Sequence, residues 1–148
     1  EPFKAHQEIQ SYLDTLDIDG QYGATASFVG TMRDFNEDKK VTYMTLEHYP
    51  GMAEAEIMRI AEQAVKRFGL LGISAIHRYG KIKPGENIVL VIATSPHRQA
   101  SFDGANFLMD FLKTRAPFWK KNHRADGEDG GWVDAKDADD DALAKWEK

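Results

Sequence analysis

Two hydrophobic patterns alternate along this chain, and their order constrains its fold more than any other feature. Apolar residues recur at helical spacing in three segments, residues 5–16, 54–68 and 102–112. Runs with the length and composition of strands occupy four others, residues 22–32, 41–49, 73–79 and 87–94. This mixed order predicts an α+β fold, a mainly antiparallel or mixed β-sheet with packed helices. At 148 residues and 42% hydrophobic content, we expect a single domain over residues 1–148, with its core in about 22–121.

The last part of the chain has a different character. Residues 122–131 are polar and contain glycine, so they predict a loop, and Trp132 and Val133 follow as a short strand or an anchoring contact. Residues 137–141 are rich in aspartate, which favours the positive N-terminal end of a helix. A carboxylate metal site is the alternative, but no second ligand cluster accompanies the run. We therefore expect a polar loop and tail over residues 122–148, with no metal and no cofactor.

Composition excludes several classes of protein. The chain has no cysteine, which rules out disulfides, zinc thiolates and iron–sulfur ligation. Its net charge of −5 argues against general nucleic-acid binding, which needs a broad basic face. No apolar run approaches the ~20 residues of a membrane span, and the first residues do not resemble a secretory signal. We expect a cytoplasmic protein that binds neither nucleic acid nor membranes.

Positive charge is nevertheless concentrated in one segment, residues 113–121, with the sequence KTRAPFWKK. Pro117 cannot continue a helix, because it lacks an N–H and its ring clashes with the preceding turn. The segment predicts a helix end that breaks into a rigid loop, anchored by aromatic residues and presenting lysines. The alternative is a solvated basic helix end, where cations suit the negative end of the helix dipole.

Two smaller basic clusters, residues 30–33 and 95–98, directly follow predicted strands. Ser95 followed by Pro96 is typical of a helix N-cap with proline in the first turn. Such a cap would direct free N–H groups toward the point where His97 and Arg98 lie, which is a natural anion site. Together the three clusters favour a ligand that carries phosphate or carboxylate.

Several of these strings occur in an order that resembles the MoaE family, the catalytic (large) subunit of molybdopterin synthase. The resemblance is carried by FVGTMR at 28–33, LEHYPGM at 46–52, IHRYG at 76–80, PGE at 84–86, SPHR at 95–98 and KTRAPFWK at 113–120. A looser match, WVDAK, follows at 132–136. The matched strings span most of the chain. Two of them, LEHYPGM and KTRAPFWK, are long and unusual.

The resemblance implies a sulfurtransferase of molybdenum cofactor biosynthesis. The family converts cyclic pyranopterin monophosphate into molybdopterin, using sulfur from a thiocarboxylate on the C-terminal Gly-Gly of a small ubiquitin-like subunit. The family assembly is a homodimer of the large subunit with one small, MoaD-like subunit at each end, a heterotetramer. The lack of cysteine agrees with this division of labour, because the chain cannot carry sulfur as a thiolate or persulfide.

The resemblance also implies roles for individual residues. It places Lys113 and Lys120 at the family's two essential lysines, with Lys113 closer to the incoming thiocarboxylate as a base, a nucleophile or a contact to the acyl group. A charge that only holds phosphate is the alternative for Lys113. Lys120 would stabilise an oxyanion or hold the substrate. Three further residues match positions that line the substrate pocket, Arg33, His97 and Arg98.

Other residues receive weaker expectations. Lys136 stands where many relatives carry arginine, a cation that would reach the neighbouring subunit's pocket. Phe118 and Trp119 are expected to wedge the lysine loop in place, with pterin stacking as an alternative. His48 and His77 lie in strand-like runs and are interpreted as core or sheet-surface histidines.

Two other functions use the same residues. The first is a non-catalytic module that binds a phosphorylated pterin or nucleotide. The second is a purely structural partner of a ubiquitin-like protein, whose Gly-Gly tail docks beside Lys113.

Overall fold

The structure is a computed structural model that describes residues 2–33, 35–36, 39–48, 51–114, 118–124, 129–133 and 146. Side chains are described for residues 2–33, 43–48, 51–114 and 146. The elements follow in the order α1 (Ala5–Thr15), β1 (Ala24–Thr31), β2 (Phe35–Asn36), β3 (Lys39–His48), α2 (Met52–Phe68), β4 (Gly72–His77), β5 (Gly80–Ile82), β6 (Asn87–Ser95), α3 (Arg98–Thr114), β7 (Phe118–Arg124) and β8 (Asp129–Val133).

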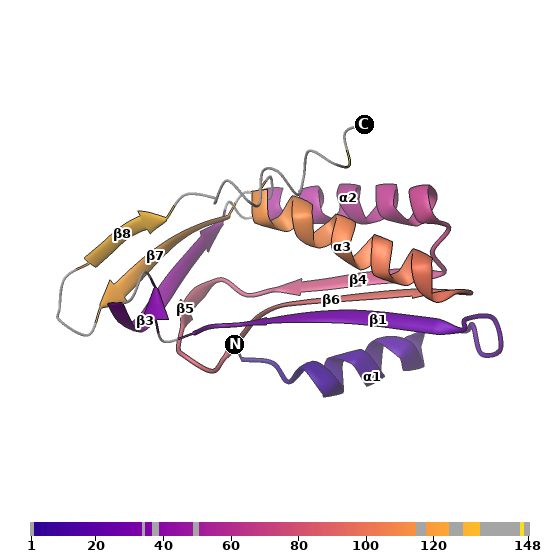
Figure 1. The fold of residues 1–148 in the computed structure, drawn as a ribbon, viewed down its shortest axis with the longest axis horizontal. Helices are drawn as coiled ribbons and strands as arrows, with labels where there is room; N and C mark the ends of the chain where they lie inside the picture. The colour runs from indigo at the N-terminus through magenta and orange to yellow at the C-terminus, as the bar shows by residue number, and fades with distance from the viewer. Residues whose placement is uncertain are drawn as a thin grey trace.

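The strands form two sheets. The first has the order β1-β6-β4, and the second has the order β2-β3-β7-β8 with β5 paired to β3. Every pairing among the described strands is antiparallel. Figure 1 shows α2 and α3 on one side of the first sheet and α1 on the other, with the second sheet beside them. The α+β prediction is confirmed, and the antiparallel alternative is the one that the structure adopts.

The main core lies between the first sheet and the helices α2 and α3. Residues 89–95 of the central strand β6 are all buried, as expected for a strand covered on both faces. From α2, Ile60 and Ala64 pack into the same cluster, and α3 adds Leu108 and Leu112. A smaller cluster, Met32, Met44, Leu46 and Ile82, lies where the two sheets meet. Burial at these positions fixes which faces of α2 and α3 remain exposed.

Most element predictions are confirmed. The three helices lie where the apolar spacing placed them, and α2 ends at Gly69, whose φ of 68° is left-handed and suits glycine. The turn before β6 is also confirmed. Trp132 and Val133 belong to a short strand, which was one predicted alternative; the other was an anchoring contact.

Three predictions about strands and loops are wrong. The chain beyond α3 resumes as strand β7 rather than as a loop, because its backbone pairs with β3 over residues 118–124. The expected loop over residues 122–131 is wrong at both of its ends, because β7 extends to Arg124 and β8 begins at Asp129. The segment 73–79 ends as a strand at His77, and a separate strand, β5, crosses to the second sheet. The predicted acidic helix turn at 137–141 lies outside the described residues.

No helix in the described part of the chain combines the length and apolarity that a bilayer crossing requires.

Candidate functional site

Lys113 lies at the C-terminal end of α3. The helix buries Leu108, Phe111 and Leu112 against the sheet, and Lys113 follows on the exposed side. The helix dipole places partial negative charge at this end, which stabilises an ammonium group there. The sequence-predicted lysine is therefore exposed, on a helix whose other face is anchored in the core.

The strand that carries Lys120 returns to the same end of the molecule. β7 begins at Phe118 and pairs with β3, so that the backbone of Lys120 lies opposite Leu46 and that of Phe118 opposite His48. Thr114 is the last residue of α3, so the chain passes within a few residues from Lys113 to this sheet. The side chains of Lys120, Phe118 and Trp119 lie outside the described residues, as does all of Lys136, and their predicted roles stay predictions.

Arg33 is exposed just beyond the end of β1. Its neighbour Met32 is buried and tied to the turn before β6, because its N–H donates to Glu86 O at 2.9 Å and its carbonyl accepts from Gly85 N at 2.9 Å. Thr31 pairs with Asn87 in the sheet register. Arg33 therefore lies at the end of the β1–β6 pair where β6 begins.

His97 and Arg98 lie at the opposite end of the same pair. β1 and β6 run antiparallel, and Ser95, the last residue of β6, pairs with Ala24, the first of β1. Both His97 and Arg98 are exposed at the start of α3. At 1.5 Å of rise per residue, Arg98 and Lys113 are separated by about 22 Å along the helix. Within one copy of the chain, His97 and Arg98 do not meet Arg33 and Lys113 at a single point.

The predicted cap at Ser95 is also wrong. Helix α3 begins only at Arg98, and Ser95 ends the preceding strand. The Ser95 hydroxyl donates to the His97 carbonyl at 2.5 Å and lies 2.6 Å from the Ser101 hydroxyl. The buried serine therefore ties the strand end to the first turns of the helix and caps no free N–H group.

Two histidines that sequence reasoning treated as structural, His77 and His48, lie near one another, and His77 is close enough to Lys113 for the ammonium charge to affect it. His77 ends β4, and its pKa is lowered to about 4. Burial is the main cause, the charges of Lys113 and His48 add to it, and the hydrogen bond to the Arg78 backbone partly opposes it. Its Nδ1 lies 2.9 Å from the Arg78 carbonyl and donates to it. The His48 ring packs on Tyr79, with ring centroids 4.2 Å apart. At neutral pH His77 is thus an uncharged imidazole with one tautomer fixed by the backbone.

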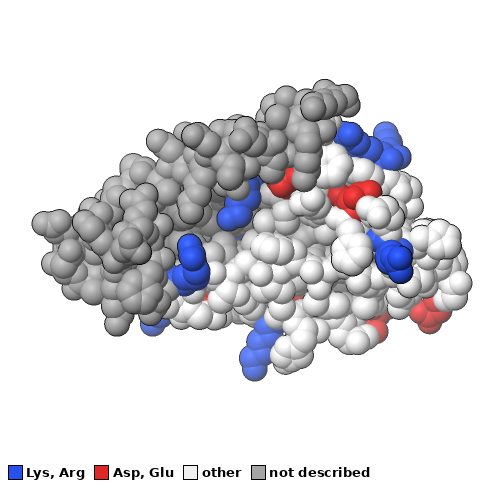
Figure 2. Space-filling view, in the orientation of Figure 1, with Lys and Arg blue, Asp and Glu red and all other residues white. Residues whose placement is uncertain are grey.

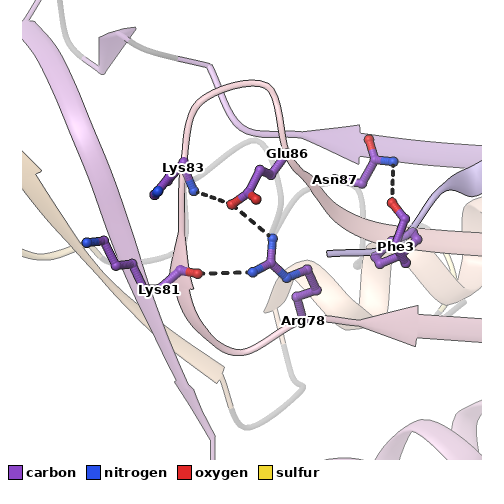
Figure 3. Close-up of polar contacts among 6 residues, drawn as sticks. All are labelled: Phe3, Arg78, Lys81, Lys83, Glu86 and Asn87. Carbon is purple, nitrogen blue, oxygen red and sulfur yellow. Dashed lines mark hydrogen bonds and ion pairs between the residues drawn. The ribbon is translucent and has the colours of Figure 1, made fainter. Parts of the chain in front are cut away.

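Arg78, the residue after His77, is buried and bonds both to β5 and to the turn before β6. Arg78 is only 7% exposed. Figure 3 shows its guanidinium donating to the Lys81 carbonyl at 3.0 Å and to Glu86 Oε1 at 3.3 Å. The Lys83 N–H donates to the same carboxylate at 2.8 Å, and this bond, with the nearby Arg78, lowers the Glu86 pKa.

This arginine stabilises the crossing from the first sheet to the second. Arg78 lies between β4, in the first sheet, and β5, which pairs with β3 in the second. The sequence signal for His77 and Arg78 was present in the string IHRYG, but periodicity could not show that a charged residue there would be buried.

Charge on the face of the molecule seen in Figure 2 is mixed over the described residues. On the face seen in Figure 2, lysine and arginine side chains lie singly or in small groups, with acidic side chains between them. This distribution suits a local anion contact better than a long polyanion.

Comparison with known proteins gives one consistent result. A family model described as MoaE protein matches residues 1–115. The molybdopterin synthase catalytic subunit of Mesorhizobium japonicum is 62% identical over 124 residues, which cover 84% of this chain and 77% of that protein. The subunit of the same name from Rhizobium meliloti is 63% identical over 124 residues, covering 84% and 79%.

Solved structures agree. The molybdopterin biosynthesis MoaE protein from Burkholderia ambifaria superposes with a TM-score of 0.77 at 42% identity, covering 100% of this chain and 94% of that one. Molybdopterin synthase from Staphylococcus aureus gives a TM-score of 0.77 at 27% identity, covering 90% and 92%.

Proposed function

The chain belongs to the MoaE family, and on that premise we propose that it is the catalytic subunit of a molybdopterin synthase. Its reaction would convert cyclic pyranopterin monophosphate to molybdopterin by adding two sulfurs as a dithiolene. The observation that carries this proposal is the position of Lys113, exposed at the end of a core-anchored helix. The strand carrying the family's second lysine, Lys120, starts a few residues further on.

Sulfur has to be brought to this site. The chain contains no cysteine, so it has no thiol that could hold sulfur between donor and substrate. A thiocarboxylate at the C-terminal Gly-Gly of a small ubiquitin-like subunit supplies it. Its sulfur bonds to a substrate carbon, and water then cleaves the acyl–sulfur bond, which leaves the sulfur on the substrate and the terminus as an ordinary carboxylate. Glycines bring no side chains, which suits a tail that must pass between close walls.

The residues near Lys113 define what the site does chemically. Lys113 contacts the acyl group of the incoming terminus as base or nucleophile, in its neutral amine form, and Lys120 stabilises the developing oxyanion or holds the substrate. The neighbouring His77 is uncharged at neutral pH, so it adds no repulsion beside the ammonium group. Arg33, at the end of β1, offers a planar guanidinium for the substrate's phosphate or pterin oxygens.

His97 and Arg98 enter this proposal only if two copies of the chain come together. They lie about 22 Å from Lys113 along α3, further than a small ligand spans. In the homodimer expected for the family, one copy contributes Lys113 and Arg33 and the other contributes His97 and Arg98. Lys136 would likewise reach the neighbour's pocket. The small subunits complete a heterotetramer, and we place the reaction in the cytoplasm on the resemblance alone.

The test is a paired incubation of the purified chain with cyclic pyranopterin monophosphate. One sample receives a small subunit with a C-terminal thiocarboxylate, and the other receives the same subunit with an ordinary carboxylate, both free of inorganic sulfide. We expect the dithiolene product, detected by mass spectrometry, only in the first. Product in both samples, or in neither, would contradict the proposal. Substrate binding without product in either sample would favour the non-catalytic binding module.

A further inference from the structure

Four consecutive exposed residues, 96–99, connect β6 to the first turn of α3, and they include His97 and Arg98. Buried serines lie on either side of this connection: Ser95 is 0% exposed and Ser101 is 1% exposed. Exposed side chains bury little apolar surface, so they contribute little to holding their own backbone in place. The conformation of the connection therefore depends on polar contacts of its backbone with the residues beneath it.

Two buried hydroxyl groups provide such contacts. The Ser95 hydroxyl donates to the His97 carbonyl at 2.5 Å. The Ser101 hydroxyl lies 2.6 Å from Ser95 Oγ and 3.1 Å from the Ala24 carbonyl, within reach of both as a donor. The pair thus joins the end of β6, the first turn of α3 and the start of β1. A buried hydroxyl that leaves its partners loses a hydrogen bond that water does not replace, so this arrangement is favoured over others.

The start of β1 approaches the same connection through its backbone. The Gly23 N–H donates to the Ser95 carbonyl at 3.0 Å. A Cβ atom at Gly23 would lie 2.4 Å from the Pro96 carbonyl oxygen, which is closer than real Cβ contacts come. The three successive carbonyls of residues 95–97 are therefore all contacted, the first two by Gly23 and the third by the Ser95 hydroxyl. Only glycine at position 23 allows the connection to lie this close to β1.

We propose that Ser95 and Ser101 are positioning residues for His97 and Arg98: their hydroxyls fix the connection, so that both cations meet a ligand in one arrangement. A group that is already ordered loses less conformational entropy when it binds, which strengthens binding. The inference rests on the proposed function only in giving the two cations a ligand. The serine network, meaning the hydrogen bonds of Ser95 and Ser101 with each other and with the His97 and Ala24 carbonyls, is a property of the protein without any ligand.

The first experiment measures the order of the connection without using the reaction. NMR relaxation of the ¹⁵N-labelled full chain gives backbone order parameters for His97 and Arg98, where about 0.85 means a rigid amide and less than about 0.6 a flexible one. Ser95→Ala removes the donor to the His97 carbonyl, and Ser101→Ala removes the hydroxyl that reaches Ser95 and β1. We expect values of about 0.85 in wild type and a fall toward about 0.6 in each variant.

Thr94→Val is the matched control. Thr94 is also 0% exposed and directly precedes Ser95, but its hydroxyl donates to the Gly72 carbonyl on β4, at 3.4 Å, and not to the connection. Valine removes this buried hydroxyl at nearly the same side-chain shape, and the order parameters of His97 and Arg98 should stay at their wild-type values. Unchanged order in both serine variants, or an equal fall in Thr94→Val, would overturn the proposal.

Sulfur transfer then tests whether this order serves the ligand. Ser95→Ala should raise KM for cyclic pyranopterin monophosphate about three- to fivefold and change kcat less than twofold, because a poorly ordered Arg98 weakens binding of substrate and transition state alike. In a chain that already carries His97→Ala and Arg98→Ala, the same substitution should not raise KM further, since no cation is left to position.

The outcomes separate the serine network from the proposed function. If wild type makes no product while the order parameters fall as expected, the network stands and the proposed function fails. If wild type is active, an unchanged KM in Ser95→Ala would refute the positioning role. A rise in KM that persists without His97 and Arg98 would also refute it, because Ser95 would then act only through the stability of the fold.

Discussion

The two ends of α3 both carry cations, but their surroundings differ. At the first end His97 and Arg98 are exposed, and the nearby serines, Ser95 and Ser101, bond to one another and to backbone carbonyls of His97 and Ala24. At the last end Lys113 lies near a buried histidine of altered pKa. Altered pKa values gather where proteins perform chemistry. The difference between the two ends supports our proposal that the reaction takes place at the last end, and that the first end serves a site shared with another copy.

The largest expected effect comes from removing the amine at the reactive end. Lys113→Ala should reduce product formation about 100-fold or more, because it removes a group that contacts the reacting atoms. The helix should remain folded, since Lys113 is exposed and alanine favours helices. Mass spectrometry of the product measures the loss, and Lys66→Ala, another exposed lysine, is the control. Near wild-type activity in Lys113→Ala would contradict the proposal that the reaction takes place at the C-terminal end of α3.

The second prediction concerns the buried arginine that supports the reactive end. Arg78→Ala should lower the free energy of unfolding by about 3 kcal/mol, because it empties a buried site and leaves the Lys81 carbonyl without its donor. Arg59→Ala breaks an exposed ion pair on α2 and should change the urea midpoint little. Similar midpoints for both variants would show that the crossing between the sheets does not depend on Arg78.

The third prediction uses the pH dependence of His77. Its folded pKa, about 4, lies below the ordinary value of 6.5, so the unfolded chain binds more protons between these values. The stability that His77 contributes is present above pH 6.5 and is lost as the pH falls toward 4. Between pH 7 and pH 4.5 the wild type should lose about 2 kcal/mol more than His77→Gln does. Urea unfolding at the two pH values measures this, and equal losses would mean that His77 is not held neutral.

Much of the fold was predictable from local pattern. The sequence predicted α2 correctly, because the features that define it are local. Its apolar residues recur at helical spacing, and Gly69 directly after them suits a left-handed helix end. The strand β7 was missed because Pro117 and the lysines suggest a loop, whereas the pairing that makes residues 118–124 a strand comes from β3, far away in the sequence.

The candidate site was predictable in its residue types and less so in its geometry. Lys113 was identified by the charge around it and by resemblance. The separation of Arg98 from Arg33 was not, because two basic clusters that each follow a strand look alike until the antiparallel register of β1 and β6 places them at opposite ends. The serine network was missed for a similar reason. Ser95, Ser101 and Ala24 meet only when α3 and β1 pack beside the end of β6.

The central claim is that the two ends of α3 belong to different sites within one copy and meet only between copies. It is tested most directly by co-expressing Lys113→Ala and Arg98→Ala chains and measuring product from the mixed dimers. Each variant alone should be strongly impaired, with Arg98→Ala reduced about tenfold or more by the loss of a charge-assisted hydrogen bond.

If one site takes Lys113 from one copy and Arg98 from the other, a mixed dimer has one site with both residues intact. In a random mixture half of the dimers are mixed, so activity should recover to about a quarter of wild type. If both residues served the same site within one copy, no dimer in the mixture would hold an intact site. A mixture no more active than its two components would contradict the account.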